Sequence, residues 1–293
     1  MGAVCVQVYM LMAWLTTLSF YGAIAAYIFS AVVVLIYIRN GNNDLLSRAK
    51  KLAAFGNVLL LLVFLSRGIE FGRIPFTGLG DSLNLFLVLC TGIILLLQRE
   101  EKMRPLMAYY LPALAILALI SGIFSPASLS EAPKELNGLL LFVHVLLVFL
   151  AFALFFIASL TSMAYVTKAQ SLKRMTSGTI AERLPSLERL DKVLFRLIGF
   201  GYPAFALTLA LGFAWAYGSR DTLGETWYFS PRIVLALFMV IFYAFSFHIR
   251  RRGLLRGPKL AYLVFFVSTA LFVMYLGIEL MQIGGYTMGG TPS

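Results

Sequence analysis

Long apolar segments alternate with short polar ones along the whole chain, and this pattern predicts its fold. A bilayer core of about 30 Å is crossed by roughly 20 helical residues, since an α-helix rises about 1.5 Å per residue. Eight apolar segments approach that length: 18–38, 52–66, 83–98, 105–124, 139–167, 197–216, 232–249 and 260–280. The sequence therefore predicts an all-α membrane protein, a single integral membrane domain over 1–293 built as a bundle of about eight transmembrane helices.

Some boundaries are less clear than others. Segments 52–66 and 83–98 are short, so each is expected to extend into its flanking loop or to tilt little. The first 17 residues are apolar but lack the basic start of a cleavable signal peptide, so they are expected to extend the first helix or to lie at the outer interface. The polar stretch 168–196 is expected to be a cytoplasmic loop with a short amphipathic helix over 187–197.

The composition agrees with a membrane protein. Of the 293 residues, 60% are hydrophobic and 13% are charged, which is far from the usage of soluble domains. A net charge of +11 would favour a nucleic-acid partner only if the basic residues formed a patch on a soluble domain. They stand instead in short runs between apolar segments. The charge therefore indicates topology in a lipid bilayer and no nucleic-acid partner.

Lysine and arginine divide unevenly between alternate connections. Nineteen fall in one set of connections, and five fall in the other. The smaller set consists of Arg67, Arg73, Lys134, Arg220 and Arg232. Because cytoplasmic connections carry an excess of basic residues, the larger set is expected in the cytoplasm and both termini outside.

The chain has two histidines, and both lie within apolar segments: His144 in LLLFVHVLLVFLAF and His248 in VIFYAFSFHIRRR. His144 is expected about 8 Å inside the outer surface, and His248 about 24 Å beyond Arg232 towards the cytoplasm, so they cannot bind one metal ion together. Each is either a hydrogen-bonded imidazole that joins helices or a ligand at its own level. His248, beside a basic run, has snorkelling as a third interpretation.

Motifs of soluble enzymes do not occur in the sequence. It contains no P-loop, GxGxxG, HExxH or GxSxG, and this argues against hydrolysis. Cys5 and Cys90 form no CxxC or CxxCH, so neither a zinc site nor covalently attached haem is indicated. Small residues at Gly199, Gly201 and 204–212 are expected to let the sixth segment approach its neighbours closely.

Aromatic residues are concentrated at the outer connection 217–231. They are Trp215 just before it and Trp227, Tyr228 and Phe229 within it. An ordinary aromatic belt at the membrane surface is one interpretation. The other is a platform on which a flat hydrophobic macrocycle stacks, with Arg220 or Arg232 near its carboxylates.

Four segments resemble one family. PSLERLDKVLFRLIGFGYPAFALTLALGFAWA is similar to the CcsA/ResC-type cytochrome c biogenesis family and its HemX-like members. LGETWYFSPR resembles that family's Trp-rich WGxYWxWDPK loop, and FHIRRRGLLRGPKLAYLVFF resembles its basic stretch after a histidine. FLSRGIEFGRIPFTGLGDSL is similar to its Arg-led outer loop, which ends in GxxPxxNxxES. The resemblance covers about residues 52–286.

The resemblance also implies a cofactor site for non-covalent, b-type haem. His144 falls where the family has an outer axial ligand of haem iron, and His248 falls on its membrane-embedded histidine, implying a second haem level. Tyr286 stands near the family's second outer histidine, so the sixth ligand would be water, Tyr286 or a residue from a partner. The remaining implied contacts are Trp215, Trp227, Tyr228 and Phe229 for stacking and Arg67, Arg73 and Arg232 for the propionates.

The implied function is haem binding and presentation at the outer face during cytochrome c maturation. The expected setting is the bacterial inner membrane, with a ResB-like subunit and apocytochrome c as partners. Any enzymatic role would be as part of a haem-to-apocytochrome c ligation complex, and no catalytic residue is assigned. The alternative is a HemX-like, non-catalytic regulator of tetrapyrrole synthesis that works through 168–196. A transporter is a third class, but the halves show no convincing repeat.

Overall fold

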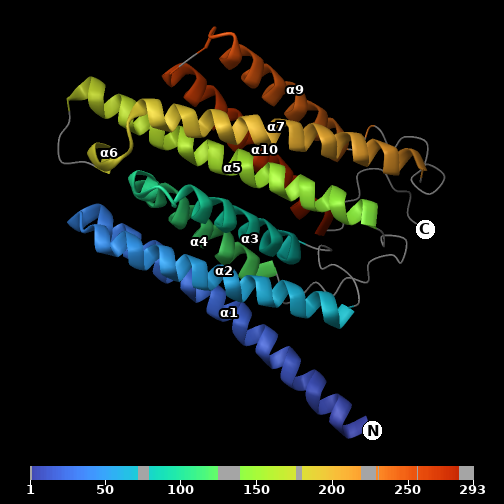
Figure 1. Ribbon diagram of the computed structural model, residues 1–293. Helices are drawn as coiled ribbons and strands as arrows, with labels where there is room; N and C mark the ends of the chain where they lie inside the picture. Colours follow the sequence, from blue (N-terminus) through green and yellow to red (C-terminus); the bar gives the residue numbers. More distant parts are fainter. Residues whose placement is uncertain are drawn as a thin grey trace. The chain divides into compact units, whose positions relative to one another are not determined.

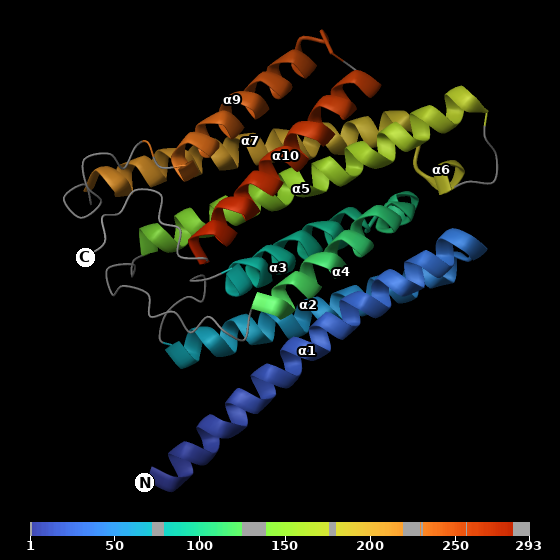
Figure 2. The same cartoon turned by 180° about the vertical axis from the view of Figure 1, so that it is seen from behind.

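The computed structural model describes residues 2–71, 79–124, 139–175, 180–218, 229, 231–255 and 257–283. Within these ranges the long regular elements are all helices (Figures 1 and 2). Eight of the helices there are long and apolar enough to cross a membrane. The predicted all-α class and number of spans are confirmed, and the chain is a multi-pass membrane protein.

The chain divides into two compact units, and the first comprises residues 1–137 and 175–185. Its helices are α1 (Gly2–Asn40), α2 (Asn43–Phe71), α3 (Leu79–Leu97), the 3₁₀ helix η1 (Glu101–Leu106), α4 (Met107–Phe124) and α6 (Ile180–Arg183). The helix α1 runs beside α2 and extends past it towards the N-terminus (Figure 1). The apolar start of the chain therefore extends the first helix, and α2 is longer than its apolar segment at both ends.

The turn between α1 and α2 is set by local chemistry. Gly41 has a φ of 72°, in the left-handed region that glycine adopts without strain. The side chain of Asn42 then accepts a hydrogen bond from the main-chain N–H of Asp44 at 2.9 Å, as an N-cap residue does. Deeper in this unit, the hydroxyls of Tyr27 and Thr91 are 2.8 Å apart and join α1 to α3.

The short helix α6 is held against the end of α1. Nη1 of Arg183 donates to the main-chain oxygens of Tyr37 at 3.0 Å and Ile38 at 3.3 Å. These carbonyls belong to the last turn of α1, where main-chain donors become scarce, and the Tyr37 carbonyl also accepts from the Gly41 N–H at 2.8 Å. The guanidinium also lies 5.5 Å from the centroid of the Tyr37 ring. Arg183 therefore caps α1 from a distant part of the chain.

The second unit comprises residues 138–174 and 186–293. Its helices are α5 (Leu139–Arg174), α7 (Leu187–Gly218), α9 (Pro231–Arg251) and α10 (Pro258–Ile283). The helix expected over 187–197 is present, but it is not a short one, because these residues are the first turns of α7. Much of the expected loop 168–196 is likewise helical. Residues 168–174 and 187–198 contain no glycine or proline, so nothing ends the helices at the membrane surface.

A column of rings crosses the second unit. A Cβ atom at Gly201 on α7 would lie 2.6 Å from the Phe155 ring on α5, so this glycine lets the two helices approach as predicted. The Phe155 ring stacks on Tyr243 of α9, with centroids 3.4 Å apart and planes 5° from parallel. The Tyr243 hydroxyl lies 2.7 Å from the Ser268 hydroxyl on α10, so its polar end has a partner.

An ion pair joins α7 to α9 at the basic end of this unit. The Arg250 guanidinium donates to the Asp191 carboxylate, and the two side chains are 21% and 22% exposed. Arg250 also lies 5.4 Å from the centroid of the Phe195 ring. The sequence marks Asp191 only as the centre of Leu190-Asp191-Lys192, and its partner was not predicted.

We expect Arg183→Ala to lower the stability of the first unit by about 1 kcal/mol, because the Tyr37 and Ile38 carbonyls lose their side-chain donor and the Tyr37 ring loses the guanidinium. Thermal unfolding of the detergent-solubilised chain measures the change. The matched control is Arg174→Ala, which removes an exposed arginine from the end of α5. An Arg183→Ala chain as stable as this control would contradict the capping role.

We expect Asp191→Asn to destabilise the second unit by about 1–3 kcal/mol, because a partly buried guanidinium is left without its carboxylate. A thermal-unfolding double-mutant cycle with Arg250→Gln should return a coupling energy between the two positions. Glu188→Gln provides the control, since Glu188 pairs with Lys192 on the exposed surface of the same helix. Additive effects of the two substitutions would contradict the coupling.

Candidate functional site

His144 lies near the start of α5, where its half-buried imidazole meets α7. Its Nδ1 is 3.0 Å from the main-chain oxygen of Thr208. A carbonyl oxygen only accepts hydrogen bonds, so Nδ1 must carry the proton and donate it. In the neutral ring, the lone pair then lies on Nε2. One nitrogen therefore joins two helices while the other keeps the electron pair that a metal ligand needs.

Gly212, one helical turn after Thr208, forms the other side of this contact. A Cβ atom at position 212 would lie 2.7 Å from Cε1 of His144 and 3.6 Å from Nε2. The imidazole therefore rests directly on the backbone of α7. The predicted close approach over 204–212 is confirmed here. His144 also joins two helices, as one of its two interpretations expected. Joining helices through Nδ1 leaves Nε2 able to bind a ligand.

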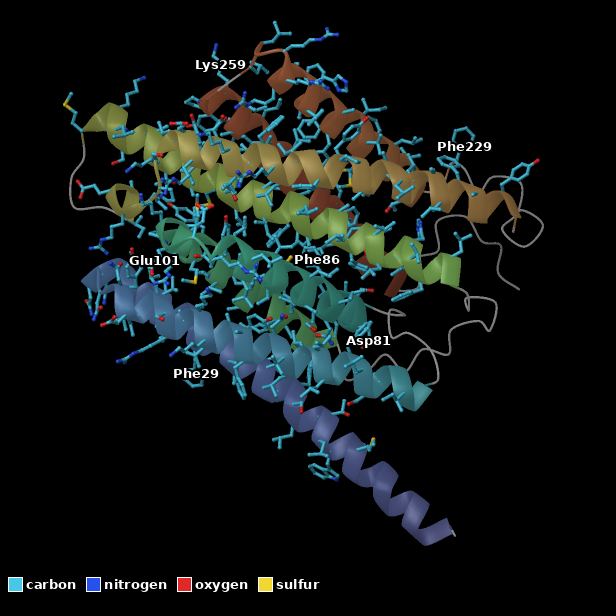
Figure 3. The ribbon with its side chains drawn as sticks, viewed as in Figure 1. Phe29, Asp81, Phe86, Glu101, Phe229 and Lys259 are labelled. Atoms are coloured by element: carbon cyan, nitrogen blue, oxygen red, sulfur yellow. The ribbon has the colours of Figure 1, made fainter. Side chains whose placement is uncertain are left out.

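The aromatic connection leaves the second unit at the same end as His144. It follows α7, which ends at Gly218, and precedes α9. Phe229 is 72% exposed and lies at that end, opposite Lys259 (Figure 3). Trp227 and Tyr228 lie outside the described residues. Trp215 and Arg232 belong to α7 and α9, but their side chains are not among those described.

His248 lies near the other end of α9 and is exposed. Its Nδ1 is 2.8 Å from the Ala244 main-chain oxygen, one turn back in its own helix. Seventeen residues separate it from Pro231 at the start of α9, which corresponds to about 26 Å of helix. The two histidines therefore lie at different levels of the second unit. The lone pair of His248 also lies on Nε2, and within the described part of the chain the hydrogen bond of its ring is to its own helix.

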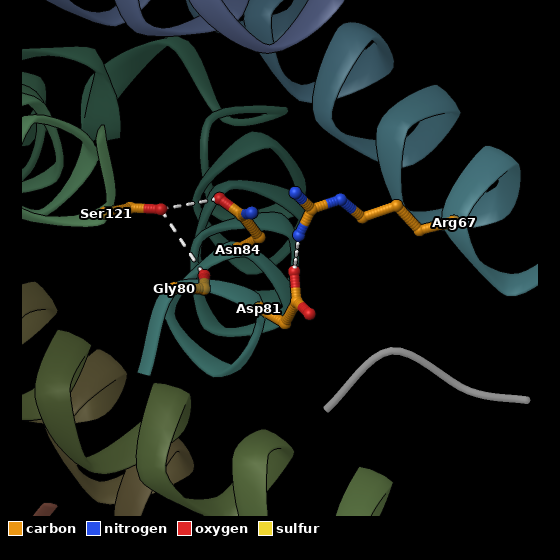
Figure 4. Close-up of polar contacts among 5 residues, drawn as sticks. All are labelled: Arg67, Gly80, Asp81, Asn84 and Ser121. Carbon is orange, nitrogen blue, oxygen red and sulfur yellow. Dashed lines mark hydrogen bonds and ion pairs between the residues drawn. The ribbon is translucent and has the colours of Figure 1, made fainter. Parts of the chain in front are cut away.

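Arg67, expected to meet a haem propionate, is paired with a carboxylate of the protein itself. Figure 4 shows its guanidinium on α2 donating to Asp81 in the first turn of α3. Beside this pair, the Ser121 hydroxyl of α4 donates to Asn84 at 2.7 Å and to the main-chain oxygen of Gly80 at 3.4 Å. Asp81 was not singled out as a partner, although its position in a first helical turn after an arginine-led loop was a usable signal. Arg73 and Tyr286 lie outside the described residues.

The donor set at His144 suits one kind of metal centre. A single imidazole nitrogen is enough for an iron that arrives with four ring nitrogens of its own, as in haem. The described neighbours of the ring are the α7 backbone at Thr208 and Gly212, and the hydrogen bond at Nδ1 fixes the tautomer that binds iron. The described residues at this end therefore fit an axial haem ligand.

Comparison with known proteins agrees with this chemistry. The model of the family described as cytochrome C assembly protein matches residues 77–285. The cytochrome c biogenesis protein CcsA of Heterosigma akashiwo is 24% identical over 90% of this chain and 89% of its own. CcsA of Chlamydomonas reinhardtii is 26% identical over 80% of this chain and 66% of its own.

A protein with another name is also similar. Protein HemX of Brevibacillus brevis is 24% identical over 76% of this chain and 82% of its own. The matched region nevertheless contains α3, α5, α7 and α9, and with them both histidines and the aromatic connection. The chain therefore belongs to the cytochrome c assembly protein family, and a role in cytochrome c biogenesis, with haem as the group the family handles, follows from that membership.

Proposed function

We propose that this chain binds haem at the outer face of the membrane, with Nε2 of His144 as an axial ligand, and presents it for cytochrome c maturation. The observation that carries the proposal is the hydrogen bond from His144 Nδ1 to the Thr208 carbonyl. That bond selects the tautomer with its lone pair on Nε2 and holds the ring on α7. An axial histidine requires both the lone pair and a fixed ring orientation. When bound, haem supplies the vinyl groups that become attached to apocytochrome thiols.

The aromatic connection is proposed as the surface on which the macrocycle lies. Trp227, Tyr228 and Phe229 are three successive aromatic residues, and the connection follows the end of α7 near which His144 contacts that helix. Non-covalent, b-type haem is proposed because the chain has no CxxCH. The sixth ligand would be water, Tyr286 or a residue from a partner.

Arginines of the outer connections are proposed to meet the propionates, because a guanidinium binds a carboxylate through two parallel hydrogen bonds. The proposed residues are Arg232, Arg73 and Arg67. Arg67 already has such a partner in Asp81, so it would have to exchange one carboxylate for another.

His248 is proposed as a second, weaker haem level near the cytoplasmic side. Its Nδ1 is bonded within α9, so the lone pair lies on Nε2, and its ring is exposed at the end of α9. The exposed basic residues Arg251 and Arg252 follow it, so carboxylates would be attracted there.

Both termini are proposed to lie outside, in the bacterial inner membrane, because basic residues favour the cytoplasmic side. In the second unit, basic Lys259 and aromatic Phe229 lie at opposite ends, which supports this assignment (Figure 3). A ResB-like subunit and apocytochrome c are the proposed partners. Both would approach the end that carries the aromatic connection.

We expect His144→Ala to lower haem per chain by at least about tenfold, because even the loss of an outer-shell partner costs about 10-fold to 100-fold in metal affinity. The measurement is the Soret band of protein purified from a haem-replete host. His248→Ala removes only the second, weaker level and should reduce the band far less than His144→Ala does. A wild-type chain without a Soret band, or an unchanged band in His144→Ala, would overturn the proposal.

A HemX-like regulator of tetrapyrrole synthesis remains the second candidate. The similarity to Protein HemX favours it, as does the fixed position of the connecting segment on α1 through Arg183. Such a regulator would use the cytoplasmic end of α5 and the segment after it.

Two sets of substitutions distinguish the candidates in cells that lack the native protein. If the chain presents haem, we expect Trp227→Ala to lower mature cytochrome c by about threefold to tenfold, because the free energy of one aromatic contact corresponds to a change of that size. Charge reversal at exposed Lys173 and Arg174 should leave cytochrome c unchanged. The regulator would be favoured if Trp227→Ala left mature cytochrome c unchanged and the charge reversal altered the level of glutamyl-tRNA reductase.

A further inference from the structure

Position 212 of α7 has no room for a side chain. A Cβ atom there would lie 2.7 Å from Cε1, 3.4 Å from Nδ1 and 3.6 Å from Nε2 of His144. The first of these distances is shorter than real Cβ contacts. Glycine is a poorer helix former than alanine, so its presence within α7 has a cost that this contact explains.

The His144 ring cannot simply move aside. Its Nδ1 is attached to the Thr208 main-chain oxygen at 3.0 Å, one helical turn before Gly212. Because the acceptor belongs to the backbone, it stays in place whatever side chain stands at 208. A methyl group at 212 would therefore either lengthen this hydrogen bond or rotate the ring about it. Either change redirects Nε2.

We propose that Gly212 is a positioning residue that sets the direction of His144 Nε2 towards haem iron. This inference rests on the proposed function, since it takes His144 as the axial ligand. Gly212 makes no contact with iron itself. It acts by letting the Cε1 edge of the imidazole approach the backbone of α7. The Thr208 carbonyl and the backbone at 212 then limit the position of the ring on two sides.

The helix α7 offers two matched controls for the same glycine-to-alanine change. At Gly199 the added Cβ would lie 3.7 Å from the Phe247 ring, an ordinary van der Waals contact. At Gly201 it would lie 2.6 Å from the Phe155 ring, a clash as severe as the one at 212. Phe155 is no ligand, so Gly201→Ala perturbs helix packing without touching His144.

The first experiment compares haem in the three full-length alanine variants, purified from a haem-replete host. We expect Gly212→Ala to change the electron paramagnetic resonance signal and midpoint potential of the haem and to lower haem per chain by about tenfold. Gly199→Ala should match the wild type. Gly201→Ala should lower thermal stability and keep the wild-type signal in the chains that fold. A wild-type signal and potential in Gly212→Ala, or the same change in Gly201→Ala, would overturn the inference.

The second experiment needs no haem and so separates this inference from the proposed function. In a His144→Ala background the ring is gone, and Gly212→Ala should shift the thermal unfolding temperature only as Gly199→Ala does. In the wild-type background it should lower that temperature clearly. Equal shifts in both backgrounds would overturn the inference even if His144 binds haem. The expected shifts without any Soret band in the wild type would uphold the contact between 212 and 144 and overturn the ligand role.

Discussion

Hydrocarbon offers no water to polar groups, and this constraint shapes the pairing of polar side chains inside the two helical units. Each helix satisfies its own backbone, so a polar side chain gains by bonding to its own helix, as Thr161 and Ser162 do, or to a neighbouring one. Tyr27 meets Thr91, Tyr243 meets Ser268, and Arg67 meets Asp81. The pairing of His144 with the Thr208 carbonyl belongs to the same series. It differs because imidazole has two nitrogens, so satisfying one of them leaves a lone pair for a ligand.

Glycines on α7 allow close packing, and this packing limits where the His144 ring can lie. At Gly201 the backbone of α7 receives the Phe155 ring, and at Gly212 the same helix receives the His144 ring. The two α5 rings thus lie on one face of α7. The Phe155 ring is purely apolar, whereas the His144 ring has two nitrogens that can bond. Packing of this kind leaves little freedom, because a ring held between helices has few places to go. A ligand on such a ring has a fixed direction.

The sequence predicted the number of spans and the level of each histidine because both depend on one-dimensional quantities, length and hydropathy. It predicted His144 as a site residue because an imidazole in an apolar segment demands an explanation. It expected a helix over 187–197 but separated it from the sixth span, although nothing in the local chemistry breaks the helix there. It did not pair Thr208 or Gly212 with His144, since a main-chain acceptor and an absent side chain carry no signature of their partner in a single sequence. It also missed Asp81 as the partner of Arg67, although the place of Asp81 in a first helical turn was a usable signal.

The class of the protein, its family resemblance and its candidate ligand were thus determined by the sequence alone. Tertiary structure alone decided which His144 nitrogen is tied, which glycine faces the ring and which carboxylate neutralises Arg67. The physical reason is that membrane helices are apolar on most sides, so hydropathy does not fix their rotation or register. Those two quantities come from packing between helices, and they determine which side chains meet.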